Sequence, residues 1–310
     1  MLLTRSEQID TLYAAAQNAG LDVAKGDISW QDEVIDVAGM KIHYLDWGSK
    51  GKRPLLLLHG GMQSAHTWDL IAVAMNRDFH VVAMDLRGHG DSDWSADANY
   101  AHAAHMGDIL GLIEHLGWDT LSLIGLSMGG LAAMHLAAER SEKLDALVIV
   151  DVGPVLNTSG VGRIANFVSG PRELDSIDDF VKRALEYNPR RRPEQLRYSL
   201  THNLRQLENG KWTWKYDPRF GMRAAQAGQQ APPTDFSELW DKLRQIECPT
   251  LVVRGGESDV LPEETALKME ATIPECRLVT VPNAGHTVPQ DNAAGFLAEV
   301  RPFLEERNPS

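Results

Sequence analysis

The chain has 310 residues, and its 43% hydrophobic and 24% charged residues are typical of a folded globular protein. Its formal net charge of −13 disfavours nucleic acid or an anionic membrane as a partner, because both repel an acidic surface. Two cysteines are too few for a disulfide framework, and no apolar run reaches the length that spans a membrane. The length exceeds the usual single domain of about 100–200 residues, which favours one large domain with an insertion.

The N-terminal stretch shows helical spacing of apolar residues over positions 6–20. It lacks a basic start followed by a long apolar core, so it does not look like a secretory signal, and we expect a cytoplasmic protein. An alternating segment at 33–48, EVIDVAGMKIHYLDWG, predicts a β-hairpin that turns at Ala38 and Gly39. We therefore expect residues 1–27 to form a helical extension, with the main domain beginning at residue 28.

Short apolar runs then recur along the chain, and most of them are separated by stretches that can be read as helices. The runs are PLLLLHGG, HVVAMDLRG, LSLIGLS, ALVIVDVG, CPTLVVRGG and RLVTVPNAG. Continuous apolar strands that alternate with helices predict an α/β fold with a mostly parallel central sheet flanked by helices. The core domain is expected to cover residues 28–152 and 246–310.

This rhythm stops between residues 153 and 245. The segment contains Pro154, Gly160, a basic cluster at Arg190–Arg192, the aromatic stretch KWTWKYDPRF and the loop GQQAPPTD. None of these reads as a strand of the same sheet. We predict that residues 153–245 form an inserted, mainly helical cap, or lid.

Ser127 lies in the motif G-x-S-x-G, formed by Gly125-Leu126-Ser127-Met128-Gly129, where a strand pattern changes into a helix pattern. Glycines relieve crowding in such a sharp turn, so that the serine hydroxyl projects from the sheet toward a substrate. The N-terminus of the following helix favours negative charge that develops on a substrate oxygen. The motif predicts that Ser127 is a nucleophile.

A serine hydroxyl is a weak nucleophile near neutral pH and needs a base, which in turn needs an orienting acid. His286 follows the last apolar run, and Asp259 follows the preceding one, which gives the order Ser, Asp, His along the chain. We expect Asp259 to be the acid and His286 the base. Asp151, at the end of ALVIVD, is the alternative acid, and Glu257 is a weaker one.

The loop after PLLLLHGG is expected to supply an oxyanion-hole donor, because glycine lets backbone N–H groups approach a substrate oxygen closely. Gly61 is the predicted donor, paired with the N–H of Met128. His59, in the same segment, is interpreted as a structural residue that bonds the loop backbone. The segment DLRGHGDS, at 85–92, is interpreted as a hydrogen-bonded loop that braces the site.

No metal or cofactor is expected. His102 and His105 have the i, i+3 spacing of two helical ligands, but no carboxylate or cysteine cluster accompanies them. We interpret them as part of a solvated helix face.

Five stretches together carry a family resemblance: LHGG at 58–61, DLRGHGDS at 85–92, GLSMGG at 125–130, GGESDVLP at 255–262 and NAGH at 283–286. They resemble the α/β-hydrolase fold family over about residues 34–150 and 246–305. The resemblance implies Ser127 as nucleophile, Asp259 as acid and His286 as base, with the amides of Gly61 and Met128 as the oxyanion hole. The insertion would be the family's cap.

One fold serves many chemistries, so the reaction must be argued from the site. The serine at position 127 of the G-x-S-x-G motif argues against members of the family that use an aspartate there. The many charges of the predicted cap favour a small dissolved carboxylic ester or lactone as substrate over aggregated lipid. One alternative is hydrolysis of a carbon–carbon bond in a vinylogous diketone. This alternative is weakened because the segment GHTVP lacks the tryptophan that usually follows the catalytic histidine in such enzymes. The other alternative is a non-catalytic member of the fold that binds a ligand.

The predicted partner is a small ester or lactone, with no nucleic acid or membrane, and the chain is expected to be a monomer or a homodimer. Candidate substrate contacts are Met62, Trp212, Trp214 and Val260. Packing of the cap onto the main domain is an equally open role for the two tryptophans.

Overall fold

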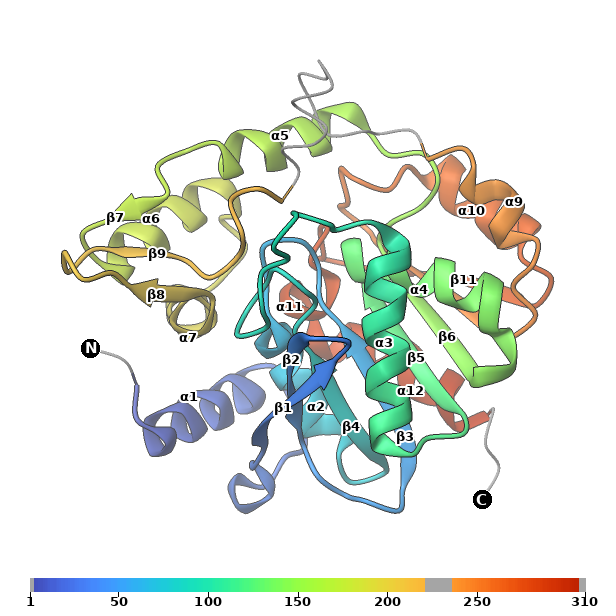
Figure 1. Ribbon diagram of the computed structural model, residues 1–310, viewed down its shortest axis with the longest axis horizontal. Helices are drawn as coiled ribbons and strands as arrows, with labels where there is room; N and C mark the ends of the chain where they lie inside the picture. Colours follow the sequence, from blue (N-terminus) through green and yellow to red (C-terminus); the bar gives the residue numbers. More distant parts are fainter. Residues whose placement is uncertain (1–2, 221–235, 307–310) are drawn as a thin grey trace.

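The computed structural model describes residues 3–220 and 236–306 and is built around an eight-stranded sheet (Figure 1). The strands run in the order β1-β2-β4-β3-β5-β6-β10-β11. Their bounds are β1 (Gln31–Val37), β2 (Met40–Asp46), β3 (Arg53–Leu58), β4 (Phe79–Met84), β5 (Leu121–Leu126), β6 (Leu144–Val150), β10 (Thr250–Gly255) and β11 (Cys276–Val281). All six predicted apolar runs therefore contain a strand of this sheet.

The sheet is mostly parallel, as expected. Strand β1 pairs antiparallel with β2, and β2 pairs antiparallel with β4, whereas the pairs from β4 through to β11 are parallel. The β1–β2 hairpin turns at Ala38 and Gly39, which both have positive φ angles, of 52° and 83°. Two central residues with positive φ match the twist of a tight hairpin, so the predicted turn is confirmed.

Helices cover both faces of the sheet. The helices are α1 (Arg5–Asn18), α2 (Asp69–Met75), α3 (His102–Leu116), α4 (Met128–Arg140), α5 (Thr158–Val168), α6 (Ile177–Tyr187), α7 (Pro193–Asn203), α9 (Leu239–Leu243), α10 (Glu263–Thr272), α11 (Val288–Asp291) and α12 (Ala293–Glu306). Short 3₁₀ turns occupy Lys25–Asp27, Ala65–Trp68 and Ser141–Lys143.

Alternate residues of the central strands face two separate apolar clusters, as the two-residue period of a strand requires. On β3, Leu55 and Leu57 pack with residues of α1, α2, α11 and α12, whereas Leu56 and Leu58 pack with residues of α3, α4, α9 and α10. Burial on both faces explains why these strands read as continuous apolar runs.

The segment between β6 and β10 forms a cap over one end of the sheet (Figure 1). Helices α5, α6 and α7 are joined there by a small antiparallel sheet of β7 (Glu173–Leu174), β8 (Leu204–Gln206) and β9 (Trp212–Trp214), in the order β7-β9-β8. The sequence did not predict these short strands, because two or three residues are too few to show alternation. The loop GQQAPPTD lies outside the described residues.

Two segments lie closer to the core than the sequence suggested. Leu239 and Leu243 of α9, which the predicted boundary at 245 assigns to the cap, belong to the apolar cluster beneath α4 and α10. At the other end, Leu12 and Ala16 of α1 belong to the opposite core cluster, so the predicted extension is packed onto the main domain. Among the described residues, no helix is both long and apolar enough to cross a membrane.

Candidate active site

Ser127 lies at the sharp turn between β5 and α4, with φ 52° and ψ −115°. This conformation is strained for a residue with a side chain and is tolerated where the surroundings fix it. Close backbone approach explains the neighbouring glycines, because a Cβ at Gly129 would lie 2.4 Å from the carbonyl oxygen of Leu58. The turn places Ser127 directly after β5, at the carboxyl end of that strand.

His286 follows β11 and hydrogen-bonds on both sides of its ring. Its Nε2 lies 3.0 Å from the Oγ of Ser127, and its Nδ1 lies 2.9 Å from Oδ2 of Asp151. A carboxylate at Nδ1 requires a proton on that nitrogen, which leaves Nε2 as the acceptor for the serine proton. The imidazole therefore has the orientation of a general base.

Asp151 lies directly after β6, and its side chain is fully buried. Its φ of 52° turns the chain sharply at the end of the strand. Besides Nδ1 of His286, the carboxylate accepts hydrogen bonds from the backbone N–H of Gly255 at 2.9 Å and from Oγ of Ser258 at 2.6 Å. These donors satisfy a buried charge that would otherwise be costly.

The expectation that Asp259 is the acid is wrong, because Asp151 and not Asp259 hydrogen-bonds to His286. The carboxylate of Asp259 pairs with Nε of Arg163 in cap helix α5 at 3.0 Å, and its side chain is 31% exposed. In the turn after β10 it is Ser258, not Asp259, that faces the sheet and reaches Asp151. The carboxylate at His286 is therefore that of Asp151, the alternative that the sequence left open.

Two backbone N–H groups lie where an oxyanion hole is expected. Met128 is the first residue of α4, where helical N–H groups have no acceptor within the helix, and Gly61 lies in the loop after β3. No hydrogen bond of either N–H appears within the described part of the chain. The preceding Gly60 donates its N–H to Oε1 of Gln63 at 3.0 Å, which fixes the shape of this loop.

The model of the alpha/beta hydrolase fold family matches residues 53–293, which include Ser127, Asp151 and His286. The chain belongs to the α/β-hydrolase family. The hydrolase is 31% identical over 309 residues to the esterase Rv0045c of Mycobacterium tuberculosis, covering 96% of this chain and 97% of that protein.

Two further similarities support this placement. The hydrolase is 31% identical over 263 residues to a 3-hydroxybutyrate-oligomer hydrolase of Cupriavidus necator, covering 82% of this chain and 90% of that protein. The crystal structure of esterase Rv0045c superposes with a TM-score of 0.75 at 30% identity, covering 98% of this chain and 99% of that one. These relatives indicate that the hydrolase is an enzyme that hydrolyses esters.

His59 of the hydrolase bonds backbone on both sides, as the sequence analysis interpreted it. Nδ1 donates to the carbonyl oxygen of Gly60 at 2.7 Å, and Nε2 accepts the N–H of Leu86 at 3.0 Å. Burial lowers the pKa of His59, so the ring is a neutral structural link. Asp85 braces the same region, because its Oδ1 accepts the N–H of Ala65 at 2.6 Å just after the oxyanion loop.

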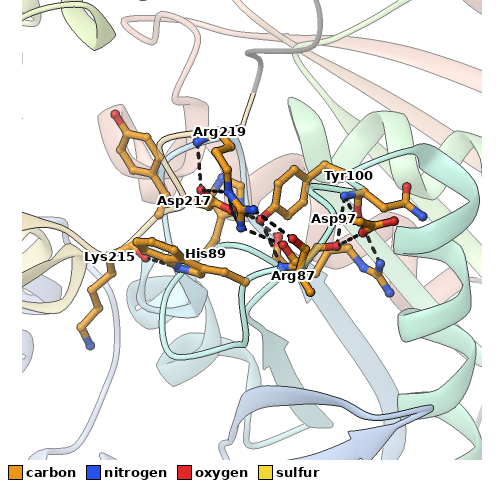
Figure 2. Close-up of polar contacts among 12 residues, drawn as sticks. Arg87, His89, Asp97, Tyr100, Lys215, Asp217 and Arg219 are labelled. Carbon is orange, nitrogen blue, oxygen red and sulfur yellow. Dashed lines mark hydrogen bonds and ion pairs between the residues drawn. The ribbon is translucent and has the colours of Figure 1, made fainter.

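The cap is held to the core by a polar cluster that we call the clasp, formed by Trp94, Tyr100, Lys215, Asp217 and Arg219 (Figure 2). The side chain of Asp217 is fully buried, accepts the hydroxyl of Tyr100 and pairs with Arg219 at 2.7 Å. The clasp thereby joins the cap segment after β9 to the core loop after β4, next to His89, whose ring lies 4.8 Å from Phe220.

The predicted substrate contacts have distinct surroundings. Trp212 and Trp214 are 6% and 7% exposed and belong to the cap's own apolar cluster, against which Met62 also packs. The rings of Trp214 and Phe180 are 5.0 Å apart. The two tryptophans therefore pack mainly within the cap itself, and not, as the sequence left open, between the cap and the main domain. Val260 is buried beside the turn that carries Ser258, and substrate contact by any of the four stays a prediction.

Among the described residues, two groups place candidate metal-ligand atoms within 4.8 Å of one another. The first is His66, Asp69 and His202, and the second is His43, Asp85 and Asp91. The rings of His66 and His202 stack at 3.5 Å with an angle of 22°. A metal bonds in the plane of an imidazole, so one ring would have to turn before both could bind the same ion. In the second group, His43 and Asp85 already bond each other at 2.7 Å. The expectation of no metal stays a prediction.

The solvated helix face expected around His102 and His105 is wrong for His105. That side chain is 2% exposed, and neither ring nitrogen has a hydrogen-bond partner within the described ranges. Burial, helped by the charge of Arg87, lowers the pKa of His105 to about 3. His102 is partly exposed and stacks on His135 of α4 at 4.2 Å, because α3 packs against α4.

Proposed function

We propose that the hydrolase cleaves a carboxylic ester or lactone of a small dissolved substrate through an acyl-enzyme on Ser127. The observation that carries this proposal is the bridging position of His286, 3.0 Å from the serine oxygen and 2.9 Å from the carboxylate of Asp151. Nucleophile, base and orienting acid in one hydrogen-bonded line are the arrangement that activates a serine hydroxyl.

In the proposed reaction, the Oγ of Ser127 attacks the ester carbonyl while Nε2 of His286 takes the hydroxyl proton. The N–H groups of Met128 and Gly61 stabilise the negative oxygen of the tetrahedral intermediate. Collapse of the intermediate releases the alcohol, which receives its proton from the imidazolium, and leaves the acyl-enzyme. A water molecule deprotonated by His286 then attacks the acyl-enzyme and releases the acid.

Asp151 acts on the imidazole in this mechanism and does not touch the substrate. Its buried carboxylate keeps the Nδ1 proton in place and stabilises the imidazolium that forms in each half-reaction. The bonds from Gly255 and Ser258 fix the carboxylate, so the base is held before the substrate arrives. Such preorganisation lowers the barrier without further movement.

Support for an ester comes from the names of the relatives, an esterase and a 3-hydroxybutyrate-oligomer hydrolase. A carbon–carbon bond hydrolase, the 2-hydroxy-6-oxo-6-(2'-aminophenyl)hexa-2,4-dienoic acid hydrolase of Metapseudomonas resinovorans, is also similar, at 24% identity. The residue after His286 is Thr287 instead of tryptophan, which favours the ester over the carbon–carbon bond.

The experiment measures turnover of p-nitrophenyl esters of several chain lengths and of simple lactones by the wild type, Ser127→Ala and His286→Ala. We expect wild-type turnover on at least one substrate, loss of roughly 10³-fold or more in both variants, and an acyl adduct on Ser127 in mass spectrometry. Turnover that survives in Ser127→Ala would contradict the proposed nucleophile. A wild type that bleaches a coloured dienol substrate but leaves every ester intact would favour the carbon–carbon reaction.

A further inference from the structure

Arg191 lies in the loop that joins cap helices α6 and α7, and in the described part of the chain no carboxylate lies within ion-pair distance of it. Its Nη1 donates to the side-chain oxygen of Gln290 at 3.1 Å, a neutral acceptor. Its Nε is shielded from solvent and has no hydrogen-bond partner, and within residues 3–220 and 236–306 no carboxylate forms an ion pair with it. The adjacent Arg190, in contrast, pairs with Glu257 at 2.6 Å.

A guanidinium in this situation is costly, because burying a charge without a partner loses hydration that nothing replaces. Burial lowers the pKa of Arg191, although the carboxylate of Asp291 opposes this shift. Asp291 itself is occupied by other donors, the N–H of Gly285 at 2.9 Å and the amide of Asn188 at 3.2 Å. The fold therefore holds a cation near Asp291 without directly neutralising it.

The position of Arg191 connects it to the active site. Gln290, its acceptor, also accepts the side-chain amide of Gln63 at 3.3 Å. Gln63 in turn accepts the N–H of Gly60 at 3.0 Å, and a Cβ placed on Gly60 would lie 3.3 Å from the Cβ of Ser127. Three hydrogen bonds thus link the guanidinium to Gly60, the glycine packed against the Cβ of Ser127.

We propose that Arg191 is a substrate-binding residue whose guanidinium pairs with a carboxylate carried by the ester substrate, so that the hydrolase prefers esters that bear an additional negative charge. The proposal rests on the proposed function and names the substrate class for the same site. A guanidinium offers a planar fork of donors that matches a carboxylate, and Nη2 has no acceptor among the described residues. The substrate would supply the missing counter-ion.

Matched ester pairs test this proposal. The first pair is mono-p-nitrophenyl glutarate, which carries a carboxylate on the acyl side, and the neutral p-nitrophenyl valerate. The second pair is the valeryl ester of 4-hydroxybenzoate, which carries a carboxylate on the alcohol side, and the neutral valeryl ester of phenol. In the wild type we expect kcat/KM to be higher for the charged member of one pair. In Arg191→Gln that preference falls about 10- to 100-fold, as expected for the loss of a charged hydrogen bond.

Two variants control for indirect effects. Arg192→Gln removes the neighbouring charge, which is exposed, and is expected to keep the wild-type preference. Arg191→Lys retains the charge but not the fork, so its preference is expected to lie between those of the wild type and Arg191→Gln. Equal losses of kcat/KM on charged and neutral esters in Arg191→Gln would mean that Arg191 only holds Gln290 in place, and would overturn the proposal. A wild type that prefers the charged ester in neither pair would also overturn it.

A binding experiment separates this proposal from the proposed function. Glutarate is titrated by calorimetry into Ser127→Ala and into the double variant that adds Arg191→Gln. We expect about 10-fold weaker binding in the double variant. This titration tests the carboxylate subsite even if the wild type hydrolyses no ester at all. Equal affinities of the two proteins for glutarate, or no binding to either protein, would overturn the proposed subsite.

Discussion

Asp151 reaches the imidazole of His286 because of its backbone conformation. A positive φ turns the chain sharply at the end of β6, and the donors Gly255 and Ser258 hold the carboxylate within 2.9 Å of Nδ1 of His286. Asp259 lies in the turn after β10 and pairs with Arg163 of cap helix α5. The two aspartates therefore have different tasks, and each task can be removed separately.

Asp151→Asn is expected to lower kcat by roughly 10³- to 10⁴-fold while the fold remains intact. An asparagine keeps the shape but presents an amide N–H to Nδ1, which reverses the tautomer that His286 needs. Steady-state kinetics on the best ester substrate measures the effect, and circular dichroism confirms folding.

Asp259→Asn is the matched control. Its ion pair is partly exposed, and such pairs contribute at most about 1 kcal/mol to stability. We expect kcat within a few-fold of the wild type. A loss as large as that of Asp151→Asn would mean that Asp259 approaches His286 during turnover and would contradict the assignment of the acid.

At the scale of elements, the cap is fixed to the core by the clasp at the end of β9. The N–H of Asp217 donates to the carbonyl oxygen of Gly88 at 2.8 Å, and Nη2 of Arg219 donates to that of Ser95 at 2.7 Å. Main-chain and side-chain bonds thus cross the same junction (Figure 2). Because Asp217 is fully buried, its hydrogen bonds contribute more than those of exposed pairs nearby.

Tyr100→Phe is expected to lower the free energy of unfolding by about 1–3 kcal/mol, because it leaves the buried carboxylate of Asp217 with one donor fewer. Urea denaturation followed by fluorescence measures the change. Lys215→Gln removes the more exposed ion pair with Asp91 from the same clasp, and we expect a change below about 1 kcal/mol. Equal effects of the two substitutions would show that burial of Asp217 does not set the strength of the clasp.

At the scale of the whole molecule, His43 on β2 connects three parts of the chain. Its Nδ1 lies 2.7 Å from Asp85, in the loop after β4, and its Nε2 lies 3.5 Å from Asp32 on β1. Burial opposes the charged form, yet the hydrogen bonds with Asp32 and Asp85 raise the pKa of His43 to about 10. Since Asp85 also accepts the N–H of Ala65, just after the loop that carries Gly61, we expect the charge of this imidazolium to affect both stability and the predicted oxyanion hole.

The stability of the hydrolase is expected to depend on pH through this group. In the unfolded chain the pKa of a histidine is about 6.5. The contribution of His43 is therefore complete below about pH 6.5 and is lost as pH rises toward 10, by an amount on the order of a few kcal/mol. Melting temperatures between pH 6 and 10 measure this loss.

His43→Gln is the comparison for this pH profile. It cannot become charged, so we expect a lower melting temperature at pH 6.5 and a flatter decline at alkaline pH. A variant whose melting temperature declines as steeply as that of the wild type would assign the alkaline loss to other groups.

The N-terminal helix is packed into the core of the main domain and is not a separate extension. Helix α1 buries Leu12 and Ala16 in the same apolar cluster as α2 and α12. The spacing of apolar residues in this segment predicted a helix but did not show which part of the protein the apolar stripe covers. An amphipathic pattern does not identify the surface against which it packs.

The sequence alone determined the local features of this protein. Each central strand is a continuous apolar run because both faces of a parallel sheet are buried, and Ser127 could be recognised because a glycine-flanked elbow is a feature of neighbouring residues. His286, the proposed base, could be identified in the same way, since it follows the last strand run. These features depend on residues that are close in sequence.

The tertiary structure decided which distant residues meet. Both Asp151 and Asp259 satisfy the chain order Ser, Asp, His, so the order did not distinguish them, and only the turn at Asp151 and the bond from Ser258 did. Gln290, the partner of Arg191, and Tyr100, a partner of Asp217, likewise lie about a hundred residues away in the sequence. Such contacts arise from packing of the cap on the core, which no periodicity in the sequence encodes.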